Sequence, residues 1–124
     1  MRILIADDNE WVRQAVIRMI SSKTNWTFCG EAADGTEALK KARIFLPDLI
    51  LIDINMPGIN GLEVSRVLRQ EVPTATIVIM SQHDPARLLP VAIEAGAHAC
   101  VDKSCLASDL LPTIKCVRPV AGDS

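Results

Sequence analysis

Five polar residues with catalytic or metal-binding potential follow apolar runs of this sequence. Asp7 and Asp8 come directly after the first run, Asp53 and Ser81 directly after two later ones, and Lys103 shortly after the last. Two carboxylates about 4 Å apart repel by roughly 4 kcal/mol at an effective dielectric near 20. A hard divalent cation with oxygen ligands removes this cost, and Mg²⁺ suits such a set. The sequence therefore predicts a Mg²⁺ site if the fold brings Asp7, Asp8 and Asp53 together.

The same residues suit phosphoryl transfer. A carboxylate such as that of Asp53 can act as a nucleophile that forms an acyl phosphate. A metal ion and the Lys103 ammonium would offset charge on the equatorial oxygens of the phosphoryl group in its loose transition state, with Ser81 as a neutral donor. The spacing alone leaves two alternatives open, phosphoryl transfer to Asp53 and a plain metal or phosphate site.

The elements that must position these residues alternate along the chain. The run Leu49–Ile52 is apolar on both faces, which is typical of a buried parallel strand. Short apolar runs alternate with segments of helical periodicity, and this predicts a doubly wound α/β domain, (βα)5, with a five-stranded parallel sheet. In the strand order 2-1-3-4-5 the carboxyl ends of the central strands would converge on one crevice. The expected strands are 2–6, 26–32, 49–52, 75–80 and 97–101, and the expected helices are 10–20, 36–45, 61–71, 85–95 and 107–118.

Helical spacing also predicts which side chains are buried. Asn9 and Asp84 are expected to cap the first and fourth helices. Pro90 should kink the fourth helix or break its early turn, and Pro112 should disturb the start of the last helix. The expected buried stripes are Trp11, Val12, Ala15, Val16, Met19 and Ile20 in the first helix, and Ala38, Leu39, Ala42 and Leu46 in the second.

Size and composition indicate a single domain. The chain has 124 residues, of which 49 % are hydrophobic, and we expect one domain over residues 1–118, with 119–124 as a frayed tail or the start of a linker. The net charge of −2 argues against direct nucleic-acid contact. No apolar stretch approaches the roughly eighteen residues of a membrane span, so we expect a cytoplasmic protein without membrane contact.

The four cysteines form no CxxC pair. Together with His98 they match no common zinc-site spacing, and we interpret them as small buried hydrophobic residues. They are Cys29, Cys100, Cys105 and Cys116.

Over nearly its whole length the chain resembles the receiver domain of bacterial two-component response regulators. The segment 48–61 is the most specific match, and the Gly-Glu-Ala-Ala-Asp-Gly motif resembles the NarL/FixJ (LuxR-type) subfamily. The resemblance implies the flavodoxin-like strand order 2-1-3-4-5 and assigns residues 1–118 to a receiver domain. The matching pieces are Ile5–Asn9, Gly30–Gly35, Asp48–Gly61, Ser81, Ala95–Ala97 and Lys103.

By position, the resemblance implies that Asp53 is the phosphoacceptor. Asp7 and Asp8 match the acidic pair that holds Mg²⁺ directly or through water, and Asn55 matches the position whose backbone carbonyl is a further metal ligand. Ser81 resembles the hydroxyl that moves toward the phosphoryl group.

Lys103 resembles the lysine that pairs with the phosphoryl group. Family members usually carry Tyr or Phe three residues before that lysine, whereas this chain has Cys100. Cys100 is too small to fill or vacate the same volume, and Pro90 and Pro112 fall on helices that family members often use for output. The chemistry therefore looks intact while the output face looks altered.

The resemblance implies a phosphorylation-controlled switch. A sensor histidine kinase, a phosphotransfer protein or a small acyl phosphate would phosphorylate Asp53 with Mg²⁺ bound. The face of the fourth helix, fifth strand and fifth helix would change, allow a homodimer and regulate transcription through a DNA-binding domain absent from this chain. Enzymatic activity would be at most self-catalysed phosphotransfer and autodephosphorylation.

Two rival functions follow from departures in the sequence. Cys100 and the two helix prolines favour a receiver-like interaction module whose output does not depend on phosphorylation. The Asp53-Ile54-Asn55 motif suggests an aspartate-nucleophile phosphatase, but no second acid stands two residues after Asp53.

Overall fold

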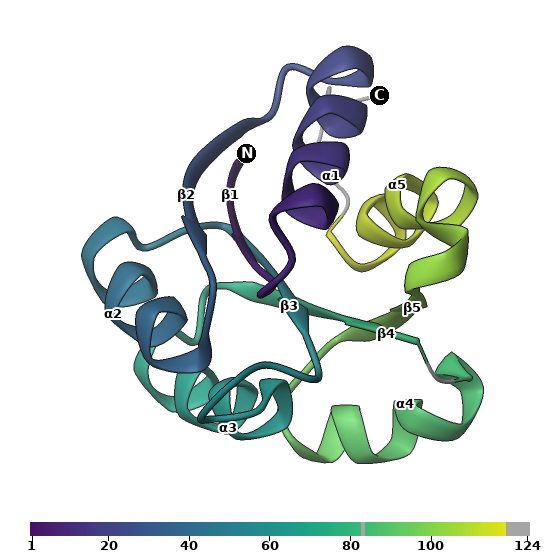
Figure 1. Cartoon of the computed structure of the whole chain (residues 1–124). Coiled ribbons are helices and arrows are strands. Elements are labelled where there is room, and N and C mark those ends of the chain that lie inside the picture. Colours follow the sequence, from purple (N-terminus) through teal and green to yellow (C-terminus); the bar gives the residue numbers. More distant parts are fainter. Residues whose placement is uncertain (83, 119–124) are drawn as a thin grey trace.

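The chain folds around one parallel sheet. In the computed structural model, which describes residues 1–82 and 84–118, five strands pair in the order β2-β1-β3-β4-β5 (Figure 1). This confirms the predicted α/β class and strand order. The predicted tail 119–124 lies outside the described residues. The strands are β1 (Arg2–Ala6), β2 (Thr27–Ala32), β3 (Leu49–Asp53), β4 (Thr76–Ser81) and β5 (Ala99–Asp102).

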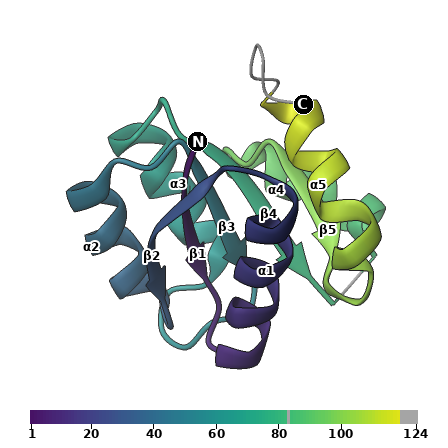
Figure 2. The same cartoon turned by 90° about the horizontal axis from the view of Figure 1, so that it is seen from above.

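Helices cover both faces of the sheet. Helices α1 and α5 lie over one face, which is the near side in Figure 2, and α2, α3 and α4 lie over the other. Among the described residues, no helix is both long and apolar enough to cross a membrane. The helices are α1 (Glu10–Lys23), α2 (Gly35–Phe45), α3 (Gly61–Glu71), α4 (Pro85–Glu94) and α5 (Leu106–Val117), with a short 3-10 turn, η1 (Lys103–Cys105), before α5.

Strand β3 is the centre of the core. All of its residues are buried, because successive side chains of a strand point to opposite faces and both faces of this sheet are covered. Ile50 and Ile52 pack on the side of α2, α3 and α4, whereas Leu49 and Leu51 pack on the side of α1 and α5. This two-sided burial accounts for the unbroken apolar run in the sequence.

The predicted stripe of α1 was wrong at two positions. Trp11 is 83 % exposed and Ala15 is also exposed, while Val16 and Ile20 are buried. Each of the two wrongly placed residues precedes a stripe residue by one position, which turns it by about 100° around the helix toward solvent. Ile17, on the opposite flank of the stripe, packs against the core instead.

Three other burial predictions were wrong. Leu46 is 60 % exposed, because it ends α2 in a left-handed conformation (φ 47°) instead of continuing the helical stripe. Cys105 and Cys116 are exposed, whereas Cys29 and Cys100 are half-buried. All four cysteines are free thiols.

The internal prolines do not interrupt their helices. Helix α4 continues through Pro90, so the predicted broken turn is wrong, whereas the alternative of a kink stays a prediction. Helix α5 begins at Leu106 and continues through Pro112, so the predicted disturbance of its start is wrong. A proline removes one backbone donor, but its fixed φ is compatible with a helix. Buried residues hold both helices against the sheet, namely Ala92 in α4 and Leu110 and Ile114 in α5.

Candidate functional site

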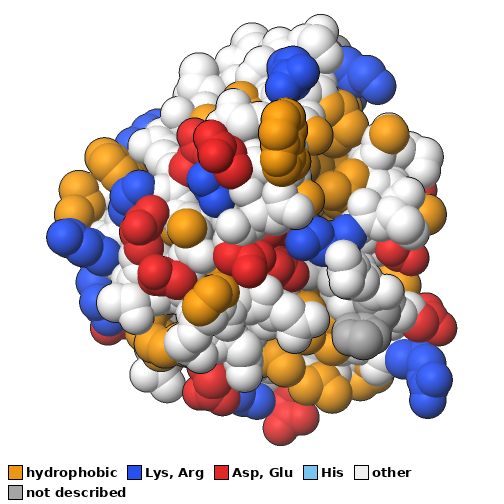
Figure 3. All heavy atoms as spheres, in the orientation of Figure 1, with side chains coloured by type: hydrophobic (Ala, Val, Ile, Leu, Met, Phe, Trp, Pro, Cys, Tyr) orange, Lys and Arg blue, Asp and Glu red, His pale blue; other side chains and the backbone are white. Residues whose placement is uncertain are grey.

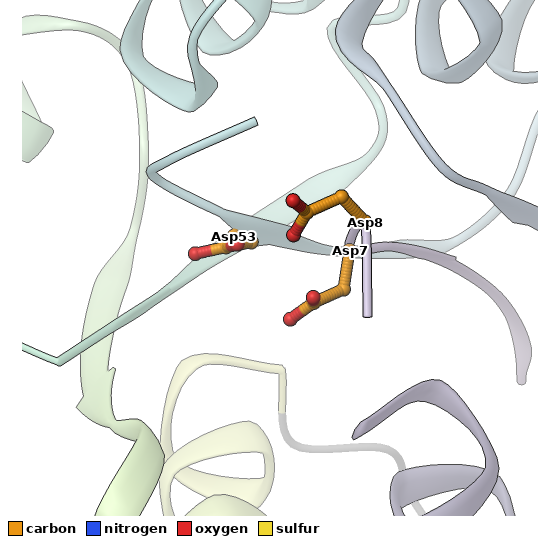
Figure 4. Close-up of side chains that lie close together, drawn as sticks. All are labelled: Asp7, Asp8 and Asp53. Carbon is orange, nitrogen blue, oxygen red and sulfur yellow. The ribbon is translucent and has the colours of Figure 1, made fainter. Parts of the chain in front are cut away.

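Two neighbouring strands deliver carboxylates to the same edge of the sheet. Asp7 directly follows β1 and Asp53 ends β3, and these strands are adjacent, so the side chains meet as predicted. Asp7 and Asp53 are buried, whereas Asp8 is exposed at the rim. One carboxylate oxygen of each residue lies within 4.8 Å of those of the other two (Figure 4).

Each of the two buried carboxylates is held by a local turn of the same kind. Asp7 Oδ1 accepts a hydrogen bond from the Asn9 N–H at 2.9 Å, and Asp53 Oδ1 accepts one from the Asn55 N–H at 3.2 Å. Each aspartate thus binds the backbone two residues later, as short polar side chains do at the ends of strands. The second oxygen of each carboxylate remains for the site.

Lys103 brings a positive charge to those second oxygens. Its Nζ lies 2.7 Å from Asp7 Oδ2 and 3.4 Å from Asp53 Oδ2, and its side chain is mostly buried. Asp102 holds the turn that presents it, because the Asp102 carboxylate accepts hydrogen bonds from the N–H and hydroxyl of Ser104. The structure therefore brings the predicted lysine to the predicted aspartates.

The electrostatics of the site favour a further cation. Burial, and then the negative charge of Asp7, raise the pKa of Asp53 against the opposing effect of Lys103. Burial alone would lower the pKa of Lys103, but Asp7 and Asp53 together raise it above its ordinary value. On the face shown in Figure 3, acidic side chains gather near the middle of the molecule, with basic side chains beside them.

The donor set fits a hard divalent ion. Among the described residues, the buried Asp7 Oδ2 is paired only with the Lys103 ammonium, whose Nζ lies 2.7 Å away. Three carboxylates from two chain segments gather here, and such oxygen donors suit Mg²⁺. One ammonium among three carboxylates leaves an excess of negative charge, which a bound divalent cation would offset.

Ser81 reaches the same edge from the next strand. It is the last residue of β4, its side chain is buried, and it pairs in register with Asp102, the residue before Lys103. A pocket of about 360 Å³ adjoins this edge and is lined by Val12, Gln82, Asp102, Lys103 and Ser104.

Sequence reasoning missed Arg13. This residue lies between positions of the apolar stripe of α1, and its guanidinium donates to the Asp7 carbonyl oxygen at 2.7 Å and to Glu31 at 3.0 Å. The sequence did contain a signal for this role. Arg13 is a basic residue on the half-buried side of a helix, less than two turns after an acidic pair.

Gly61 allows the loop after β3 to close against the site. A Cβ at this position would lie 2.6 Å from the Asp53 carbonyl oxygen and 2.9 Å from Ile54 Cα. Both atoms belong to the backbone, so they cannot rotate away. The loop instead closes with a hydrogen bond from the Gly61 N–H to the Ile54 carbonyl.

Gly61→Ala is therefore expected to lower the free energy of unfolding by about 1–3 kcal/mol, as overpacking does in rigid sites. Urea denaturation measures this change. Gly30→Ala is the matched control, because its Cβ would meet only side-chain atoms, at 3.3 Å and beyond, and should cost less. Equal stability losses in the two variants would contradict the steric argument.

Comparison with known proteins shows the family of the chain. Residues 3–115 match the family model described as the response regulator receiver domain. Response regulator GacA of Pseudomonas viridiflava is 36 % identical over 121 residues, which cover 94 % of this chain and 55 % of the relative. The nitrate/nitrite response regulator protein NarL of Escherichia coli K12 is 36 % identical over 112 residues, covering 90 % and 52 %.

A solved structure shares the same fold. A two-component response regulator of the LuxR family from Aurantimonas sp. SI85-9A1 superposes with a TM-score of 0.87 at 34 % identity, covering 94 % of this chain and 83 % of that chain. The present chain spans about half the length of the curated relatives it matches. Fold, family model and relatives agree, and the chain belongs to the response regulator receiver domain family.

Proposed function

We propose that the domain is a phosphorylation-controlled switch in which Asp53 is the phosphoacceptor. The observation that carries this proposal is the position of Lys103 Nζ, 2.7 Å from Asp7 and 3.4 Å from Asp53. The Asn55 N–H donates to Asp53 Oδ1, so in this proposal the attacking atom is Asp53 Oδ2. The donor would be a sensor histidine kinase, a phosphotransfer protein or a small acyl phosphate.

The proposed reaction moves one phosphoryl group. An Asp53 carboxylate oxygen forms a bond to phosphorus while the bond from phosphorus to the donor nitrogen or oxygen breaks, and the donor atom keeps that electron pair. Lys103 offsets charge on the transferred oxygens, and Ser81 supplies a neutral donor to them.

The proposed Mg²⁺ ligands are the carboxylates of Asp7, Asp8 and Asp53 with the backbone carbonyl of Asn55. When bound, Mg²⁺ supplies charge compensation for the carboxylates and the phosphoryl oxygens. The clustering of the three acids, whose negative charge exceeds the single positive charge of Lys103, supports this assignment.

The proposed output surface is the face of α4, β5 and α5. The exposed apolar side chains of Leu89 and Ile93, one turn apart on α4, support it, because exposed apolar groups favour contact with another chain. Phosphorylation would bias a two-state equilibrium of this face, controlling self-association and transcription through a separate DNA-binding domain. The curated relatives named as response regulators support that role.

Labelling by acetyl phosphate tests the proposal. Incubation with Mg²⁺ is expected to add one phosphoryl group per chain, and removal of Mg²⁺ with EDTA is expected to prevent it, since the carboxylates then repel the incoming group. Intact-mass spectrometry measures the adduct. Failure of the wild-type domain to be labelled by any phosphoryl donor in Mg²⁺, including a phosphohistidine protein, would contradict the proposal.

A second candidate function is that of an interaction module whose output does not depend on phosphorylation. Cys100 favours it, since this half-buried residue of β5 stands where the family usually has an aromatic side chain. Self-association measured with and without beryllofluoride separates the two candidates. A coupling free energy below about 1 kcal/mol would favour the second.

A further inference from the structure

One peptide bond connects two of the three clustered carboxylates. Asp7 and Asp8 are consecutive, and the peptide unit between them is planar, so the direction of the Asp7 carbonyl constrains how both side chains leave the backbone. On its other side, the Asp7 N–H donates to the Ala32 carbonyl at 3.0 Å. The orientation of this peptide therefore constrains where the two carboxylates can lie.

Arg13 holds that peptide from helix α1. Its Nη1 donates to the Asp7 carbonyl oxygen at 2.7 Å, and its Nε donates to Glu31 Oε1 at 3.0 Å. The side chain is only 15 % exposed, and Gln14 also donates to Glu31 Oε1, at 3.1 Å. Because the guanidinium is a rigid planar fork, two acceptors from different segments fix its direction.

We propose that Arg13 is a positioning residue for the Mg²⁺ site. It ties the Asp7 carbonyl to the end of β2 through Glu31 and so keeps the Asp7 and Asp8 carboxylates at the spacing a cation requires. This inference rests on the proposed function, since it assumes that these carboxylates bind Mg²⁺. Arg13 touches neither the cation nor the phosphoryl group and acts through Asp7.

The alternative to positioning is a simple charge effect. The two roles predict opposite changes in Mg²⁺ affinity when Arg13 is removed. A cation close to a metal site repels Mg²⁺, so on charge alone removal of Arg13 would tighten Mg²⁺ binding. If Arg13 positions the ligands, its removal weakens binding although a repelling charge is lost. The sign of the change therefore distinguishes the two roles.

Titration of Mg²⁺ by isothermal calorimetry, without any phosphoryl donor, tests the proposal. Arg13→Gln is expected to weaken Mg²⁺ binding about 10-fold, the lower end of what loss of an outer-shell partner costs a metal site. Arg13→Lys is expected to weaken it similarly, because lysine keeps the charge but lacks the planar fork that reaches both acceptors. Circular dichroism confirms that the variants are folded.

Arg43→Gln is the matched control. It removes the same charge and an ion pair of similar length, 2.6 Å from Arg43 Nε to Glu71 Oε2, at the end of α2 far from the acidic cluster. Its Mg²⁺ affinity should equal that of the wild type. Unchanged or tighter binding by Arg13→Gln, or wild-type affinity in Arg13→Lys, would overturn the role of Arg13. A wild-type domain that binds no Mg²⁺ would instead contradict the proposed function.

Discussion

Asp53→Asn is expected to abolish Mg²⁺-dependent labelling by acetyl phosphate and binding of beryllofluoride. The amide has nearly the same shape as the carboxylate, and its oxygen can still accept the hydrogen bond from the Asn55 N–H. It lacks the negatively charged oxygen that attacks phosphorus, so the acyl phosphate cannot form. Intact-mass spectrometry after incubation with acetyl phosphate measures the loss.

Asp48→Asn is the control for this experiment. Asp48 precedes the same strand at its opposite end, where its carboxylate accepts a hydrogen bond from the Arg2 N–H at 2.8 Å. The two variants lose the same charge, but only Asp53 lies among the clustered acids. Labelling should persist in Asp48→Asn. Undiminished labelling of Asp53→Asn would remove this residue from the proposed role and direct attention to the other carboxylates.

Lys103→Met is expected to lower the rate of phosphorylation by roughly 100-fold, the usual cost of removing one charge-stabilising donor from a reaction site. Lys103 Nζ lies between Asp7 and Asp53 in a mostly buried position, where its charge is poorly screened by water. Methionine has similar bulk and no charge. Time courses of labelling at saturating Mg²⁺ measure the rate.

The Mg²⁺ affinity of Lys103→Met should be equal to or tighter than that of the wild type, since the variant removes a cation from the edge of the site. A slower reaction with unimpaired Mg²⁺ binding would assign Lys103 to the phosphoryl group. Lys115→Met, an exposed position on α5, controls for the loss of charge and should keep the wild-type rate. Equal rates in the wild type and Lys103→Met would show that the ammonium contributes nothing to transfer.

The sequence determined the fold through a few local signals. The run Leu49–Ile52 has apolar residues on both faces, and only a strand between two layers buries such a run completely. The turn-forming residues after it ended the strand, and the N-cap at Asn9 marked the start of α1. These signals depend only on neighbours in the chain, so they can be recognised without knowledge of the tertiary structure.

Local sequence signals could not predict the burial of residues at the edge of a helix's buried face. Trp11 and Val12 are both apolar and adjacent, and the sequence does not say which of them the next layer covers; the fold covers part of Val12 and leaves Trp11 in solvent. The same holds for Pro90 and Pro112, where packing against the sheet outweighs the loss of one backbone hydrogen bond.

For the candidate site as well, some features were predictable from the sequence and others depended on the tertiary structure. The residue types of Asp7, Asp8, Asp53 and Lys103, and their places after apolar runs, were sufficient to predict which side chains belong together. Only the tertiary structure decided that Lys103 Nζ lies 2.7 Å from the buried Oδ2 of Asp7 and that Arg13 holds the carbonyl of the same residue. Such contacts join segments that are distant in the chain or lie on different elements, so they depend on strand register and helix packing, which no local pattern encodes.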